Sequence, residues 1–163
     1  MHDESETPES FWRRYLDGLP SDHSHRRVIP DVFAFGGGGA VADELADLVL
    51  GGRKRATTSL AIEFTSLGEP LPEIGSLSIV LRRDLAPVAI IERTEVRTLP
   101  FAAVTAEYAA VEGEGDGSLD YWRAAHREYF AWVCARLGGE FHDLTPVICQ
   151  VFRVVWPRRK EET

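Results

Sequence analysis

The chain has 163 residues, of which 44% are hydrophobic and 27% are charged, a balance typical of one globular domain. Its formal net charge of -8 argues against a protein that binds long nucleic acid regardless of sequence, because such binding depends on many phosphate contacts. A small nucleotide, or a short RNA segment in a local basic pocket, is compatible with this charge. No apolar run approaches the roughly 20 residues that a membrane span needs, so no membrane partner is expected.

The N-terminus and the cysteines predict a cytoplasmic protein. Met1 to Glu9 is acidic and polar, unlike a secretory signal. Cys134 and Cys149 lie in apolar contexts without a motif spacing, which predicts buried, reduced thiols. The five histidines are scattered along the chain, so the sequence predicts no metal site and no other cofactor.

The first third of the chain predicts two helices and an extended segment between them. A short helix is expected from Glu9 to Leu16, where Gly18 and Pro20 end it. An apolar extended segment is expected from Pro30 to Phe35. Apolar residues at helical spacing predict a second helix from Ala40 to Leu50. The four glycines before it predict a flexible loop, with a phosphate cradle as the alternative.

The remainder of the chain predicts mostly strands. Alternating and apolar patterns, separated by Gly/Pro-rich loops, predict strands at Thr57–Thr65, Leu77–Leu81, Val88–Val96 and Pro146–Trp156, and helices at Pro100–Val111 and from Ser118 to about Leu137. This mixture predicts the α+β fold class, with the strands curling into a small β-barrel. The predicted organisation is a disordered N-terminus over residues 1–10, a single domain over 11–157 and a basic tail over 158–163.

The hexapeptide Gly52 to Thr57 follows the second helix and places a lysine and a threonine three positions apart. One interpretation is a helix end, where Arg53, Lys54 and Arg55 complement the negative end of the helix dipole and Thr57 is simply a strand residue. The other is a reactive site, where a partly desolvated Lys54 acts as a base toward the Thr57 hydroxyl. The spacing alone leaves both interpretations open.

Two later segments could complete such a site. Glu112, Glu114 and Asp116 alternate with glycines, either as a solvated acidic loop or with one carboxylate placed across a cleft from Lys54 to shuttle protons. In the helix that follows, Trp122 and His126 share the apolar face. They are either core residues or a pocket wall on which a base could stack.

Taken together, these pieces resemble the ASCH domain family, whose fold is PUA-like, and in particular its larger bacterial stand-alone subgroup. The resemblance rests on a Gly-x-Lys-x-x-Thr step at Gly52–Thr57, on the acidic Glu-Gly-Glu-Gly-Asp loop at 112–116, and on the helix that carries Trp122, Arg123 and His126. It covers roughly Phe11 to Val155.

The resemblance implies a small β-barrel with flanking helices and a cleft suited to RNA or a nucleotide-like ligand. Some similar members remove an N4-acetyl group from modified cytidine with a lysine, a threonine and a glutamate; others are assigned ribonuclease activity, and many have no assigned activity. Carried onto this sequence, it implies Lys54, Thr57 and Glu112 as the catalytic residues, with Glu114 as the second choice for the glutamate.

The leading hypothesis is therefore metal-independent amide hydrolysis of an N4-acylated cytidine-like base. Thr57 would attack the acyl carbonyl, Lys54 would take the hydroxyl proton, and Glu112 would relay a proton to the leaving amine. The expected substrate-binding residues are Arg53, Arg55, Ser59, Glu114, Asp116, Trp122 and His126. Two alternatives are a binding module for RNA, a nucleotide or a modified nucleoside, and a ribonuclease with Lys54 and His126 as acid and base.

Overall fold

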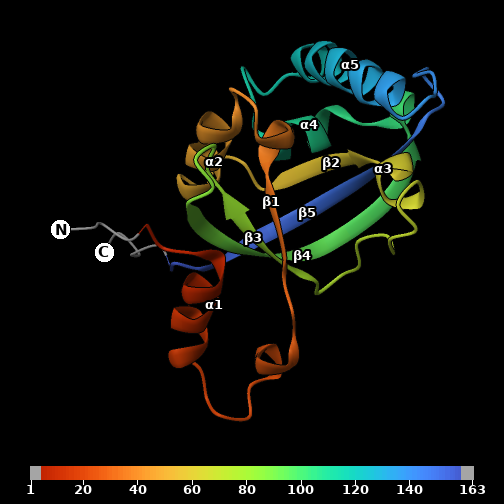
Figure 1. The fold of residues 1–163 in the computed structure, drawn as a ribbon. Coiled ribbons are helices and arrows are strands. Elements are labelled where there is room, and N and C mark those ends of the chain that lie inside the picture. The colour runs from red at the N-terminus through yellow and green to blue at the C-terminus, as the bar shows by residue number, and fades with distance from the viewer. Residues whose placement is uncertain (1–4, 159–163) are drawn as a thin grey trace.

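Five strands form one curved sheet in the computed structural model, which describes residues 5–158 (Figure 1). The strands are β1 (Asp31–Ala34), β2 (Ala56–Leu60), β3 (Leu77–Leu81), β4 (Pro87–Pro100) and β5 (Pro146–Trp156), in the spatial order β1-β3-β4-β5-β2. β1 runs parallel to β3, and the other neighbours are antiparallel. Within residues 5–158 no ladder joins β1 to β2, so the sheet is a half-barrel that is open between these two edge strands.

Helices surround this half-barrel. They are α1 (Pro8–Asp17), α2 (Ala42–Leu50), α3 (Ala61–Thr65), α4 (Ala106–Glu112) and α5 (Leu119–Arg136), with short 3-10 turns η1 (Ser24–Arg27), η2 (Phe35–Gly38) and η3 (Phe101–Ala103). Figure 1 shows α4 and α5 over the β2 side of the sheet and α2 beside it, with α1 at the far end. None of the described helices has the length and apolar character that crossing a membrane requires.

Two apolar clusters fix the helices that flank the site. Ala46 and Val49 of α2 pack in one cluster with Ile91 of β4. Phe130 of α5 packs in the other with Leu60 at the end of β2. Burying apolar area is the main stabilising term in folding. This packing therefore holds α2 and α5 on opposite sides of β2.

The sequence-based elements are largely confirmed, and so is the α+β class with a curved, barrel-like sheet. The strands at Leu77–Leu81 and Pro146–Trp156 have the predicted bounds, and Ser118 caps α5 as expected by accepting the Tyr121 N–H at 3.1 Å. Cys134 and Cys149 are buried and free. The strand predicted at Val88–Val96 is longer, because β4 extends to Pro100.

Three predictions are wrong in part. The strand predicted over Thr57–Thr65 ends at Leu60, because Glu63 accepts the Leu60 N–H at 2.8 Å and starts α3. The helix predicted over Pro100–Val111 divides into η3 and α4, since Thr105 caps a new helix start. Disorder does not extend over residues 7–10, where Thr7 caps α1. Residues 1–4 and most of the predicted basic tail, 159–163, lie outside the described residues.

Candidate functional site

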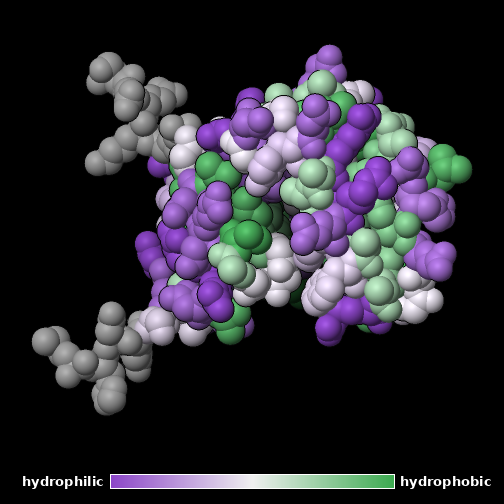
Figure 2. Space-filling view, turned by 90° about the horizontal axis from the view of Figure 1, so that it is seen from above, coloured by the Kyte–Doolittle hydropathy of each residue, from purple (hydrophilic) through white to green (hydrophobic). Residues whose placement is uncertain are grey.

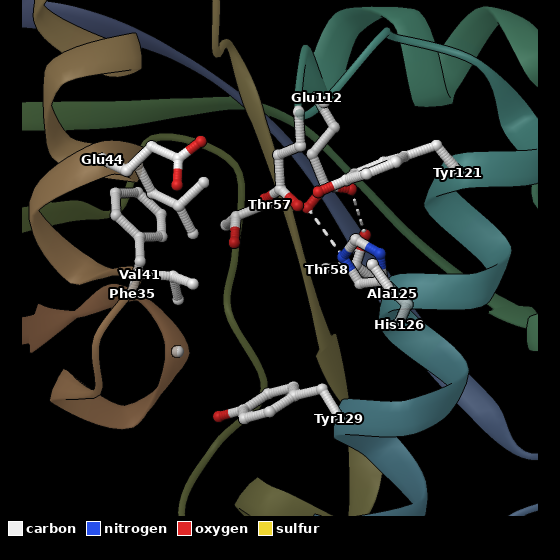
Figure 3. Close-up of a pocket in the computed structure, with 14 residues that line it drawn as sticks. Phe35, Val41, Glu44, Thr57, Thr58, Glu112, Tyr121, Ala125, His126 and Tyr129 are labelled. Carbon is white, nitrogen blue, oxygen red and sulfur yellow. Dashed lines mark hydrogen bonds and ion pairs between the residues drawn. The ribbon is translucent and has the colours of Figure 1, made fainter.

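A cavity of about 250 Å³ lies between α2 and α5, above β2. Figure 2 shows this face of the molecule hollowed between its α2 and α5 sides. The cavity is lined by Phe35, Gly36, Val41, Glu44, Leu45, Thr57, Thr58, Glu112, Glu114, Gly115, Tyr121, Ala125, His126 and Tyr129 (Figure 3). Its walls are thus part aromatic and part ionisable, which is the usual character of a ligand site.

The end of α2 directs Lys54 into the protein. Gly52 has φ +80°, a left-handed conformation that glycine adopts without strain after a helix. The backbone N–H groups of Arg53 and Lys54 both donate to the Leu48 carbonyl at 3.0 Å, which completes the helix end. The chain then enters β2, and the Lys54 side chain points inward, leaving the residue 1% exposed.

Two carboxylates hold the buried Lys54 ammonium. Its Nζ lies 2.8 Å from Glu114 Oε1 and 3.3 Å from Glu112 Oε1, and 5.1 Å from the centre of the Phe35 ring. A buried charge is costly unless it is paired and hydrogen-bonded, so Glu112 and Glu114 are required to keep Lys54 in place. Glu112 and Glu114 are therefore not part of a merely solvated acidic loop.

Glu112, the last residue of α4, is 1% exposed and accepts four donors. Its Oε2 accepts the Thr58 hydroxyl at 2.9 Å and the Trp122 indole N–H at 2.5 Å, while its Oε1 faces Lys54 and His126. Burial would raise the pKa of Glu112, but Lys54, then His126 and the hydrogen bonds, lower it to about 2. Glu112 is thus a fixed anion and a poor proton carrier near neutral pH.

His126 is held in the cavity wall by both ring nitrogens. Nδ1 lies 2.8 Å from the Trp122 carbonyl oxygen and must donate to it, while Nε2 lies 3.2 Å from Glu112 Oε1. Only the imidazolium form donates at both nitrogens. Burial would lower the pKa of His126, but the Glu112 charge and hydrogen bond outweigh it, so the pKa is raised. This geometry favours the protonated ring.

The acidic loop is fastened to the hexapeptide. Gly113 has φ +69°, and a Cβ there would collide with the Arg53 carbonyl. The Arg53 guanidinium donates in turn to the Gly115 carbonyl, and Gly115 lies against the Tyr121 ring. Close backbone approach therefore requires glycine at 113, and it carries Glu112 and Glu114 to Lys54.

Strand alternation separates the two adjacent threonines. Thr58 shares the face of Lys54 and Glu112, where its hydroxyl also lies 3.0 Å from the Tyr108 hydroxyl. Thr57 points the other way, is half-buried and lines the cavity (Figure 3). In the part of the chain that the structure describes, the Thr57 hydroxyl has no hydrogen-bond partner. The Lys54–Thr57 hydrogen bond expected for an activated nucleophile is therefore not made here.

Several predicted binding residues have other roles. Trp122 is 1% exposed and stacks on His126 at 4.2 Å and on Phe101 at 5.3 Å, so neither face is free to stack a base. The prediction that Trp122 stacks on a base is wrong, because its indole lies inside the protein, where the N–H donates to Glu112. Asp116 is exposed and accepts the Ser118 N–H at 2.9 Å.

The two arginines of the hexapeptide lie outside the cavity. The exposed Arg55 makes its contacts through its backbone, whose N–H donates to Val111 and whose carbonyl accepts from Phe152, each at 2.9 Å. Arg53 is exposed and fastens the acidic loop. Neither side chain lines the cavity, so the structure does not place these two predicted substrate-binding residues there. Ser59 lines a second, adjoining cavity.

Sequence reasoning missed Thr58 and Tyr108 as parts of the site. The Tyr108 hydroxyl donates to the Thr57 carbonyl at 2.8 Å and accepts the Gln150 N–H at 3.2 Å, which fixes β2 under α4. A signal for Tyr108 existed, because Tyr108 and Glu112 are four apart and share one face of a helix. The cavity-lining Tyr121, Tyr129 and Glu44 carry no comparable motif.

Ligand atoms of Glu112, Glu114 and His126 lie within 4.8 Å of one another, a grouping that could hold a metal ion. The Lys54 ammonium already lies against both carboxylates. The cluster therefore carries its own cation, and we assign no metal to it.

The comparisons with known proteins agree with this geometry. The family model described as the ASCH domain matches residues 31–156. The ASCH domain from Lactobacillus crispatus JV V101 has a TM-score of 0.84 at 35% identity, covering 90% of this chain and 92% of that chain. Protein EF3133 from Enterococcus faecalis V583 has a TM-score of 0.81 at 31% identity, covering 94% and 97%. No curated protein matches the chain. The chain belongs to the ASCH domain family, and the expected PUA-like fold is confirmed.

Proposed function

We propose that the protein hydrolyses an amide on an acylated nucleobase, with an N4-acylated cytidine as the substrate that the family resemblance suggests. One observation carries the proposal: the Thr57 hydroxyl, which has no hydrogen-bond partner within residues 5–158, lines a cavity whose wall contains Glu112 and Glu114, the two carboxylates that hold the buried Lys54. Such clusters cost folding free energy and are typical of functional sites.

The proposed reaction begins at Thr57. Lys54 passes a proton to Glu114, 2.8 Å away, and its neutral amine then rotates to accept the Thr57 hydroxyl proton. Oγ1 of Thr57 attacks the acyl carbonyl carbon, the carbon–nitrogen bond breaks, and Lys54 gives the proton to the departing amine. Water then cleaves the acyl-threonine ester, which releases a carboxylic acid and regenerates the hydroxyl.

In this proposal Glu114, rather than Glu112, exchanges protons with Lys54. The Glu114 side chain is 14% exposed and lines the cavity, whereas Glu112 is committed to four donors. Glu112 is thus a positioning residue that holds Lys54 and His126.

A second candidate is binding of RNA or a nucleotide without turnover. It is favoured by the engagement of Lys54 with two carboxylates and by its lack of a bond to Thr57 within residues 5–158. Here the cavity would recognise a base, and Thr57 would be a contact for the ligand. RNA binding is compatible with membership of the ASCH family.

Incubation of the purified protein with N4-acetylcytidine in a buffer containing a chelator separates the two candidates. The first predicts release of cytidine and acetate, measured by chromatography, and loss of release in Thr57→Val. Saturable binding without any release would instead support the second candidate. N4-acyl groups of increasing length would then show how much of the cavity the acyl chain fills.

A further inference from the structure

A second cavity of about 250 Å³ fills the opening of the half-barrel between β1 and β2. Both strands contribute to its walls, and Arg93 of β4 and Gln150 of β5 also line it. The two cavities share the wall residues Phe35, Gly36, Thr57, Thr58 and Tyr129. Thr57 thus lies where the two cavities meet, and one ligand could occupy both.

Arg93 is the unusual residue of this second cavity. It is 6% exposed, its Nε donates to Gln150 Oε1 at 2.6 Å, and its Nη1 donates to Ser78 at 2.8 Å. Within residues 5–158 no carboxylate oxygen lies within 4 Å of the guanidinium, and Nη2 has no hydrogen-bond partner. Because no fully buried side-chain nitrogen or oxygen in the described part of the chain lacks a partner, Nη2 keeps access to open space. Nη2 is therefore a fixed, charged donor without an acceptor among the described residues.

The strand register places Gln150, the hydrogen-bond partner of Arg93, beside Thr57. Gln150, which Arg93 contacts, is the direct partner of Thr57 in the antiparallel β2–β5 pair. Directly opposite side chains lie on one face with Cβ atoms about 5 Å apart. Ser59 shares this face and accepts from Gln150 Nε2 at 3.2 Å, which leaves its own O–H free to donate. The arrangement therefore offers donors on one side of Thr57, opposite the Lys54 cluster.

The charges that line the second cavity select the kind of ligand. Besides Arg93, the charged lining residues are Asp31 and Glu63. Asp31 accepts from Ser78, and Glu63 accepts the Leu60 N–H through one oxygen at 2.8 Å. Burial lowers the pKa of Arg93 while Asp31 raises it, and a guanidinium keeps its charge in proteins. One cation faces two carboxylates, so a phosphate or another anion would be repelled, whereas a neutral carbonyl oxygen would be accepted.

We propose, resting on the proposed function, that the second cavity binds the pyrimidine ring of a neutral nucleoside. Arg93 Nη2 donates to the ring carbonyl oxygen, and the acyl group extends past Thr57 into the first cavity. Asp31 or Glu63 accepts a sugar hydroxyl. The site therefore recognises a nucleoside in preference to a nucleotide.

Binding measured without turnover tests this proposal separately from hydrolysis. In the Thr57→Val background, calorimetry with cytidine, cytidine 5′-monophosphate and inorganic phosphate gives three affinities. We expect cytidine to bind and phosphate neither to bind nor to compete. Arg93→Lys should weaken cytidine binding by at least about tenfold, the loss expected for a hydrogen bond to a charged group. Arg97→Lys, an exposed arginine of the same strand, is the matched control.

Equal cytidine affinity in Arg93→Lys, or tighter binding of the monophosphate or of phosphate, would overturn the proposal. Because Arg93 also links β4 to β5, a second readout uses the unaltered protein. Cytidine should shift the ¹⁵N signal of the Arg93 guanidinium, and 2-thiocytidine, a weaker acceptor, should shift it less. An unchanged signal on saturation with cytidine would contradict the proposal. These results stand whether or not the protein hydrolyses an acylated base.

Discussion

Thr58 donates a hydrogen bond of 2.9 Å to Glu112, while the hydroxyl of its neighbour Thr57, which lines the same cavity, has no hydrogen-bond partner within residues 5–158. Thr58→Val should therefore lower the free energy of unfolding by about 1–3 kcal/mol, because it leaves Glu112 without one of its donors. Thr57→Val should change stability little and abolish turnover. Urea unfolding and a hydrolysis assay on the two variants measure the two effects.

The opposite pattern would contradict this assignment. If Thr58→Val lost hydrolysis while remaining folded, and Thr57→Val retained it, the nucleophile would be Thr58. The two residues are adjacent and of one type, so each variant is the matched control of the other.

Glu112→Gln should be among the more destabilising polar substitutions in the protein. A glutamine side chain has one accepting oxygen and one donating NH₂ group. The NH₂ group would therefore face other donors, either those of Thr58 and Trp122 or the cations of Lys54 and His126. Removing one partner of a buried ion pair costs about 3–5 kcal/mol. Glu114→Gln should cost less, because its side chain is 14% exposed. Equal losses in urea unfolding would show that Glu112 is not the anchor.

The buried charges predict how stability depends on pH. The pKa of Glu112 is depressed to about 2 in the folded protein, so its contribution is complete above its ordinary value of 4.5 and is lost as the pH falls toward 2. The pKa of His126 is raised, so its contribution is complete below 6.5 and is lost as the pH rises through the raised value.

Unfolding measured across this pH range should thus show falling stability at both ends. In His126→Gln the loss on the alkaline side should be smaller than in the unaltered protein, while the acid side is retained. An NMR titration in which the His126 ring deprotonates below its usual range would contradict the assignment.

The approach of the acidic loop to the hexapeptide can be tested at Gly113. Gly113→Ala forces alanine into φ +69° and also drives a Cβ into the Arg53 carbonyl. Gly117→Ala meets a similar φ, +78°, with nothing within 4 Å. We expect Gly117→Ala to cost about 1 kcal/mol for the backbone alone, and Gly113→Ala to cost clearly more and to reduce ligand binding. Equal melting temperatures would mean that the close contact is unimportant.

Local patterns were sufficient for most of the fold. The apolar runs predicted β3 and β5, and Ser118 marked the start of α5, because these signals lie within a few residues of each other. The end of β2 was missed, since the alternating pattern continues past Leu60. The strand ends there because Glu63 accepts the Leu60 N–H, and a hydrophobicity pattern does not reveal such a contact.

For the candidate site, the sequence indicated several of the residues that lie together but not how their side chains are arranged. The spacing of Lys54 and Thr57 suggested direct contact, but the strand that begins at Ala56 puts Thr58 on the side of Lys54 instead. Trp122 was expected among the substrate-binding residues, and its burial depends on the distant Phe101. Arg93 gave no signal, because its partner Gln150 is far away in the sequence. Such pairings are set by the tertiary fold.

The most direct test of the account is the release of cytidine from N4-acetylcytidine by the purified protein, compared with Lys54→Met and Thr57→Val in the same chelated buffer. Circular dichroism of each variant shows whether it is folded. We predict turnover by the unaltered protein and, in the folded variants, a loss of at least about a hundredfold, as for removal of a nucleophile or its base. Turnover that persists in folded Thr57→Val, or no turnover of any N4-acylated cytidine by the unaltered protein, would contradict the proposed hydrolysis.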